Sequence, residues 1–252
     1  MPNRNFDHVL LARDELMQLA TLDTKRYCVA PDTMVGRYHS DQFWMEVLAP
    51  NRVGQMDAAL AHKFLVSFQL TNRIVWDKAL VANEIRNFAL HAPPDPVLAI
   101  MGLANGLRGA NRRGTRQTSA ASKTAMLGRP MDAAYIWDKL AACSARGRDW
   151  HRQGRPAKRH TRSVFLDKGE HDYAAHHAAC ARALADERER EDFQAAVVAV
   201  EEFLKGVGGP MANRDRVPID FTERRLLDKL RAHPGISESG IMRSACFWIS
   251  VA

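Results

Sequence analysis

The segment 113–140 reads RGTRQTSAASKTAMLGRPMDAAYIWDKL, and its pattern decides how the rest of the chain is interpreted. Gly114 lies between basic residues, where its conformational freedom favours a tight turn. The small residues that begin at Thr118 predict a helix whose backbone other elements can approach closely. Gly128 and Pro130 end this helix, because neither residue continues a helix readily. We therefore expect a basic turn followed by one short helix of small residues.

An apolar run follows that helix and leads to a single carboxylate. The residues from Ala134 to Trp137 are apolar or aromatic, and Asp138 comes directly after them. A carboxylate that lies against aromatic side chains, amid Arg and Lys, is partly desolvated. Such a group can act as a general base or as a counter-charge to a developing cation. Asp138 is therefore the candidate catalytic residue.

Outward from this segment, the chain is predicted to be all-α. Apolar residues recur at spacings of three and four, whereas alternating β-branched residues are almost absent. Pro93, Pro94 and Pro96 interrupt this pattern and predict two helical lobes, residues 1–95 and 96–252, that form one compact unit. The helices are expected at residues 5–22, 55–70, 74–91, 95–106, 118–127, 133–145, 170–201 and 222–232.

The positive charge is concentrated in the middle of the chain. The formal net charge is +7, and residues 106–162 hold fourteen Lys or Arg against three Asp, a net of +11. Residues 146–161, RGRDWHRQGRPAKRHT, predict an exposed loop. Arg pairs with phosphate oxygens and a Trp face stacks on a base, so we interpret this region as a nucleic-acid contact rather than a merely solvated loop. The expected DNA-binding residues are Arg112, Arg113, Gly114, Arg116, Arg152, Arg155, Lys158 and Arg159.

Several other classes of protein are not indicated by the sequence. The four cysteines are far apart and form no CxxC pair, which favours reduced, buried thiols over a zinc site. His171, His176 and His177 lack a Cys or a suitably spaced carboxylate, so no metal is predicted. No apolar segment is long enough to cross a membrane, and the N-terminus has no signal-peptide pattern. We expect a cytoplasmic, nucleoid-associated protein with no cofactor and no obligatory protein partner.

The central segment resembles a family of DNA-repair enzymes. Ser122-Lys123, Leu127, Arg129-Pro130 and the run from Ala134 to Asp138 are similar to the core pattern of bacterial 8-oxoguanine DNA glycosylase OGG-like proteins, which are distant relatives of the helix-hairpin-helix glycosylases. In that superfamily a hairpin binds the DNA backbone, the next helix carries a catalytic lysine or none, and an aspartate follows. The resemblance implies a two-lobed, helical DNA-glycosylase-like fold with a degenerate helix-hairpin-helix.

The resemblance assigns roles to residues one position at a time. Asp138 matches the catalytic aspartate, Lys123 matches the lysine of the Ser-Lys pair, and residues 113–118 occupy the hairpin. Two departures are visible: the glycine pair of the hairpin is reduced to Gly114, and the position of the lyase lysine falls near Ser119 and Ala120, neither of which can form a Schiff base. For Lys123, the open roles are a substitute for that lysine, a salt bridge or a phosphate contact.

The resemblance therefore implies a monofunctional glycosylase that acts on double-stranded DNA. The target nucleotide is flipped out of the duplex, and Asp138 stabilises the oxocarbenium-like sugar and orients the attacking water. Trp137 and Trp44 are the candidates for stacking on the flipped base, with burial in the core as their alternative role. The base is not identified: it is a damaged base, or a modified base such as hypermodified cytosine in phage DNA, which would make the protein an antiviral enzyme.

Two other functions fit the sequence. The run from Arg86 to His91 has the Arg and His spacing of HEPN-type ribonucleases, in which these two side chains cleave RNA across a dimer cleft. Its alternative is a histidine that stabilises the C-terminal end of a helix. The second possibility is a DNA-binding protein that has kept the fold without the chemistry. The need for Asp138 in a reaction distinguishes this possibility from a glycosylase.

Overall fold

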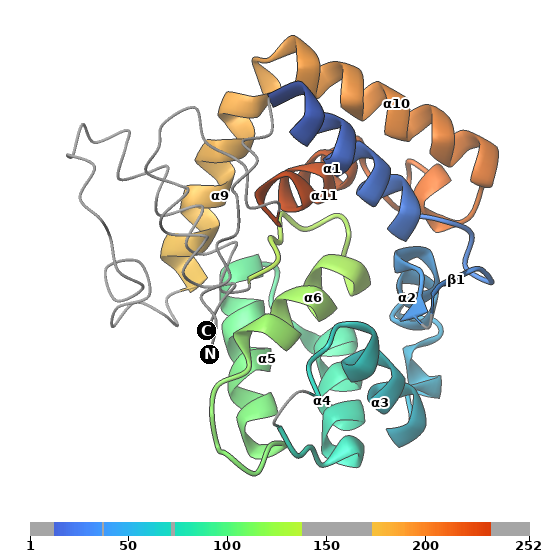
Figure 1. The fold of residues 1–252 in the computed structure, drawn as a ribbon. Helices are drawn as coiled ribbons and strands as arrows, with labels where there is room; N and C mark the ends of the chain where they lie inside the picture. The colour runs from blue at the N-terminus through green and yellow to red at the C-terminus, as the bar shows by residue number, and fades with distance from the viewer. Residues whose placement is uncertain (1–12, 37, 72–73, 138–172, 233–252) are drawn as a thin grey trace, which may run out of the picture.

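The computed structural model describes residues 13–36, 38–71, 74–137 and 173–232. In this part of the chain helices dominate, and the only strands form one short antiparallel hairpin, so the predicted all-α class is confirmed (Figure 1). The α-helices are α1 (Arg13–Tyr27), α2 (Asp41–Val47), α3 (Ala58–Ser67), α4 (Lys78–His91), α5 (Pro96–Gly109), α6 (Thr118–Gly128), α9 (Tyr173–Arg188), α10 (Glu191–Val207) and α11 (Ile219–Ala232). The short elements are β1 (Met34–Val35), β2 (Tyr38–His39) and the 3-10 helices η1 (Val53–Gln55) and η3 (Pro210–Ala212).

The helices form two groups, and the larger of two hydrophobic clusters extends from one group into the other, to Val200 and Leu204 of α10 and Phe221 of α11. In Figure 1, α2 to α6 make the lower group, and α1, α9, α10 and α11 make the upper group. The first helix packs on α10 and α11 rather than on the helices that follow it. The boundary expected at residue 95 falls between α4 and α5, which pack against each other within one cluster, so residues 1–95 and 96–252 do not coincide with the two groups. Representative core residues are Phe64, Ile85 and Leu103 in the lower cluster and Leu184, Phe193 and Leu226 in the upper one.

Four helices begin at a side-chain cap that the sequence supplies. Ser40, Asp57, Asp77 and Asp95 accept hydrogen bonds from first-turn amides of α2, α3, α4 and α5, respectively. Each cap of this kind stabilises a helix by about 1 kcal/mol. Because Asp77 caps the helix, α4 begins at Lys78, whereas the sequence predicted a start at residue 74. Residues 74–77 instead run beside the turn between α5 and α6.

The helix predicted for residues 5–22 continues to Tyr27 as α1, and two further predictions differ from the structure more strongly. Residues 133–137, the described part of the helix predicted for residues 133–145, are irregular, because side chains of α9 and α11 bind their carbonyl groups. The helix predicted for residues 170–201 is two helices, α9 and α10. Arg13 of α1 holds their junction, because it pairs with Glu187 at 2.6 Å and with Asp192 at 2.5 Å. In both cases contacts remote in sequence override the local helical pattern.

A buried group of charged side chains joins α2 to α11. Arg225, 4% exposed, donates to Asp41 through Nε at 2.7 Å and to Asp228 through Nη1 at 2.6 Å. Burial opposes the charged form of Arg225, but the two carboxylates outweigh it and raise the pKa of this guanidinium. The Arg225 guanidinium therefore keeps its charge in the folded protein.

Lys229 gives this charged group a pH dependence. Its Nζ lies 3.6 Å from the centroid of the Tyr27 ring, and burial, together with Arg225, lowers the pKa of Lys229 from 10.5 to about 8. The unfolded chain therefore binds more protons than the folded chain between pH 8 and pH 10.5, so the free energy of unfolding rises with pH in this window. The carboxylates that oppose the shift are Asp228, Asp41 and Asp23.

Lys229→Met is expected to remove this pH dependence. Urea unfolding of wild type and of Lys229→Met is measured at about pH 7 and about pH 9.5. The amount by which the free energy of unfolding of the variant exceeds that of wild type should be about 2 kcal/mol smaller at the higher pH. The other titratable groups are present in both chains, so their contribution cancels in the difference between the two free energies of unfolding. An advantage that stays constant over this range would contradict the lowered pKa of Lys229.

Candidate nucleic-acid interface

Helices α5 and α6 pack together and are joined by the hairpin turn, residues 110–117, which one buried asparagine holds in shape. Asn111, 4% exposed, donates through Nδ2 to the carbonyls of Leu107 at 3.0 Å and of Thr115 at 2.9 Å. Its Oδ1 accepts from the Thr115 amide at 3.3 Å. Gly114 has a φ of +60°, a conformation that glycine adopts without strain. The turn predicted around Gly114 is confirmed, and internal hydrogen bonds hold it rigidly.

The segment before α4 holds the hairpin turn from one side. The Arg112 amide donates to the Val75 carbonyl at 3.1 Å, and the Asp77 amide donates to the Ala110 carbonyl at 2.8 Å. These two bonds form an isolated antiparallel bridge between Trp76 and Asn111. The hairpin turn is thus anchored to the N-terminal half of the chain as well as to its own two helices.

The arginines of this region divide into two that hold the turn and two that face solvent. Arg108 donates through Nε to the Gly114 carbonyl at 2.7 Å, and Arg116 donates through Nε to Asn105 Oδ1 at 3.0 Å. Arg112 and Arg113 are exposed, and neither guanidinium has a hydrogen-bond or ion-pair partner within the described ranges. The guanidinium groups of Arg112 and Arg113 therefore remain available for an external anion.

The N-terminal end of α6 opens onto the same turn and lacks a side-chain cap. Gln117, at the cap position, makes no hydrogen bond to the first-turn amides, and its own side chain donates to Thr115 instead. The Thr118 hydroxyl, 2% exposed, has no hydrogen-bond partner in the described part of the chain. Amides at a helix N-terminus carry partial positive charge and bind phosphate readily. Gln117 and Thr118, at the start of α6, are however buried, so the contacts offered to an external anion come from the two exposed arginines.

On α6, two polar residues line the partly exposed side of an otherwise buried helix. Lys123 donates through Nζ to Ser119 Oγ at 3.0 Å, and the same Nζ lies 5.9 Å from the centroid of the Phe68 ring. Lys123 lies one helical turn after Ser119 on α6. The Lys123 ammonium group therefore lies beside the Ser119 hydroxyl.

Residues 129–137, named the strap here, link α6 to Asp138 and are held by side chains from other helices. The Trp137 amide donates to Ser122 Oγ of α6 at 2.9 Å. Tyr173 of α9 accepts from the Tyr135 amide at 3.0 Å and donates to its carbonyl at 2.7 Å. Arg224 of α11, fully buried, donates to the carbonyls of Ala134 and Pro130, both at 2.8 Å. The end of the strap at Trp137 is therefore fixed against α6.

The remaining predicted site residues are either buried or beyond the described part of the chain. Trp44 is fully buried in the lower cluster, with its ring edge-on to Phe64, so it presents no face to a base and belongs to the core. Trp137, 8% exposed, is also packed in that cluster. Asp138, Arg152, Arg155, Lys158 and Arg159 lie outside the described residues.

The Arg86 and His91 pair lies on α4 but does not form a site within one chain. Arg86 donates to the Met56 carbonyl through Nη1 at 2.6 Å, whereas His91 is exposed at the last residue of the helix. Residues five apart are about 140° apart around a helix. The two side chains therefore point from different faces, and Arg86 has a structural partner.

Asn111 and Arg108 are the residues of this interface that sequence reasoning missed. An asparagine just before a glycine-containing turn is a signal for side-chain bonding to the backbone, and it could have indicated Asn111. In the described ranges, no group of His, Cys, Asp and Glu is arranged to hold a metal ion, and no helix is long and apolar enough to cross a bilayer. Comparisons with protein families, with curated proteins and with solved structures give no match to this chain.

Proposed function

We propose that the protein is a DNA glycosylase that holds the DNA backbone with the α5–α6 hairpin. The observation that supports this most strongly is the hairpin turn itself: Arg112 and Arg113 are exposed and unpartnered among the described residues. Phosphate contacts of this kind fix the register of a protein on a duplex. The glycosylase chemistry rests on the resemblance of the segment from Ser122 to Asp138.

The proposed reaction is hydrolysis of the bond between a damaged or modified base and deoxyribose. The flipped nucleotide is held while Asp138 stabilises the positive charge on the sugar and orients the attacking water. The strap supports this role, because Trp137, the residue before Asp138, is bonded to Ser122 on α6. Lys123 supplies a positive charge on the same helix. The absence of a lysine at Ser119 supports a monofunctional enzyme with no lyase step.

Salt dependence of DNA binding tests the role of the hairpin turn. Each phosphate that an arginine neutralises contributes about −0.9 to the slope of log K against log salt concentration. Arg113→Gln is expected to reduce the slope by about one on unmodified duplex DNA, measured by fluorescence anisotropy at several salt concentrations. Arg52→Gln is the matched control, because Arg52 is an exposed arginine paired with Glu46 at 3.1 Å. Equal slopes for wild type and Arg113→Gln would show that the hairpin turn does not contact phosphate.

A further inference from the structure

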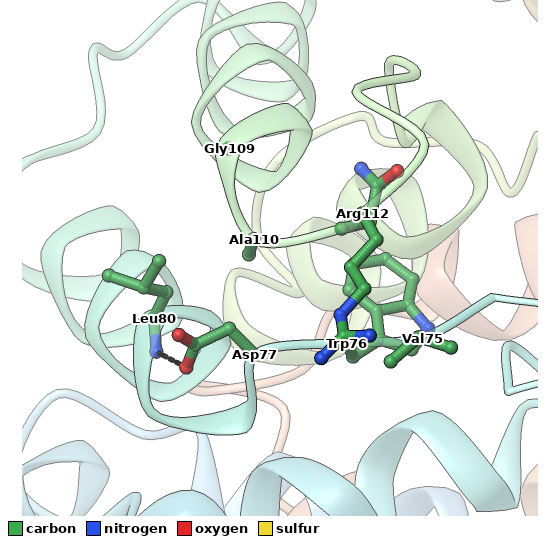
Figure 2. A pocket seen from close by; sticks show the side chains of 8 residues that line it. Val75, Trp76, Asp77, Leu80, Gly109, Ala110 and Arg112 are labelled. Atoms are coloured by element: carbon green, nitrogen blue, oxygen red, sulfur yellow. Dashed lines mark hydrogen bonds between the residues drawn. The ribbon is translucent and has the colours of Figure 1, made fainter.

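A pocket of about 340 Å³ lies between the hairpin turn and the start of α4 (Figure 2). Figure 2 shows Arg112 and Trp76 on one side, Asp77 and Leu80 on the other, and the backbone of Gly109 and Ala110 above them. The apolar wall is open to solvent, because Val75 is 57% exposed and Leu80 is 45% exposed. The pocket thus offers apolar surface that no side chain of the described residues covers.

Two charged side chains of opposite sign, Arg112 and Asp77, line this pocket, and each has polar atoms without a hydrogen-bond partner among the described residues. The Arg112 guanidinium has no hydrogen-bond or ion-pair partner within the described ranges. Asp77 uses Oδ1 to accept from the amides of Ala79 and Leu80, both at 3.1 Å, and its Oδ2 has no donor in the same ranges. The pocket therefore presents a guanidinium for an anion and a carboxylate oxygen for an amino group.

We infer that this pocket binds one nucleotide of the DNA strand held by the hairpin, with its phosphate on Arg112 and an amino-bearing base, cytosine or adenine, against Asp77. This inference rests on the proposed function and names a second contact with the same substrate. A guanidinium pairs with phosphate oxygens, and a carboxylate oxygen accepts from an exocyclic amino group but repels a keto oxygen. Val75 and Leu80 pack against the sugar and the base.

Asp77 carries the base preference, and this makes the inference testable with two pyrimidine nucleotides that differ in the group at position 4 and in the proton on N3. The 4-amino group of dCMP is replaced by a keto oxygen in dUMP, so wild type should bind dCMP more tightly. Asp77→Asn keeps the helix cap, since Asn caps as well as Asp does, but it can place an amide NH2 group where Oδ2 stands. The variant is therefore expected to prefer dUMP over dCMP.

The full chain is titrated with dCMP and with dUMP, and binding is monitored through the NMR signals of the Val75 and Leu80 methyl groups. Arg112→Gln should weaken binding of both nucleotides roughly tenfold, the loss expected for one charge-assisted hydrogen bond. Arg52→Gln and Asp57→Asn are the matched controls, because Arg52 lies outside the pocket and Asp57 caps α3. Both controls should bind as wild type does.

Equal affinity of wild type for dCMP and dUMP, or no reversal in an Asp77→Asn chain that keeps its helical circular dichroism, would overturn the inference. Mononucleotides need neither a duplex nor base excision, so these outcomes are independent of whether the protein is a glycosylase. A single-stranded cytosine oligonucleotide should bind more tightly than dCMP. Equal affinity for the cytosine oligonucleotide and for dCMP would assign the pocket to free nucleotides and overturn the inference that it binds part of a DNA strand.

Discussion

Replacing Asp138 with asparagine is expected to lower the rate of base excision by about 10²- to 10⁴-fold. Asparagine keeps the shape of the side chain but removes the negative charge that, in the proposed reaction, stabilises the sugar cation and orients water. Binding of the duplex should change by less than about twofold, because counterion release at phosphates dominates affinity. The measurement is single-turnover formation of alkali-labile sites at saturating protein.

Asp132→Asn is the matched control for this variant. It removes the same charge six residues earlier, where the Asp132 carboxylate pairs with Arg129 at 2.7 Å near the start of the strap. This partly exposed ion pair contributes little to stability, so activity should stay within about threefold of wild type. Equal rates for Asp138→Asn and wild type would remove Asp138 from the reaction and leave a DNA-binding protein.

Replacing Arg225 with leucine is expected to lower the free energy of unfolding by about 3–5 kcal/mol. The change leaves the Asp41 carboxylate, 2% exposed, without the guanidinium that binds it at 2.7 Å. An uncompensated buried charge is far more costly than the loss of a surface pair. Because α2 and α11 belong to different helical groups, the contact between the groups should weaken together with global stability. Urea unfolding followed by circular dichroism measures the effect.

Two further variants identify the cause of that loss. Arg190→Leu removes an exposed arginine that pairs with Asp192 at 3.6 Å, and it should cost at most about 0.5 kcal/mol. Adding Asp41→Leu to Arg225→Leu should restore part of the lost stability, because an apolar pair leaves fewer unpaired charges in the interior. If the double variant is less stable than Arg225→Leu alone, the loss comes from packing and not from the isolated carboxylate.

Local signals in the sequence predict the central helix well and its surroundings poorly. The helix predicted for residues 118–127 is confirmed as α6 (Thr118–Gly128), because small residues and the Gly-Pro exit are local features. The strap was missed because its hydrogen-bond partners, Tyr173 and Arg224, are 38 and 90 residues away in the sequence. Local periodicity carries no information on partners at that distance.

The candidate site shows the same limit. The exposure of Arg112 and Arg113 fits the prediction from charge density, which requires only that arginines cluster in a turn. The structural use of Arg108 could not be predicted, because it depends on the position of the Gly114 carbonyl after the turn closes. In the sequence, a tryptophan that stacks on a base and a tryptophan of the core look the same. Only the packing of Trp44 against Phe64 shows that Trp44 belongs to the core.

The most direct test of the proposed function is abasic-site formation on a panel of DNA duplexes. Wild type and Asp138→Asn are incubated with unmodified, oxidised, hydroxymethylated and glucosylated duplexes, followed by mild alkali, which breaks the strand at abasic sites. A monofunctional glycosylase predicts alkali-dependent breaks on at least one modified duplex with wild type alone, and no breaks before alkali. Intact DNA throughout, with cleavage of RNA instead, would contradict the proposal and favour a ribonuclease that uses Arg86 and His91.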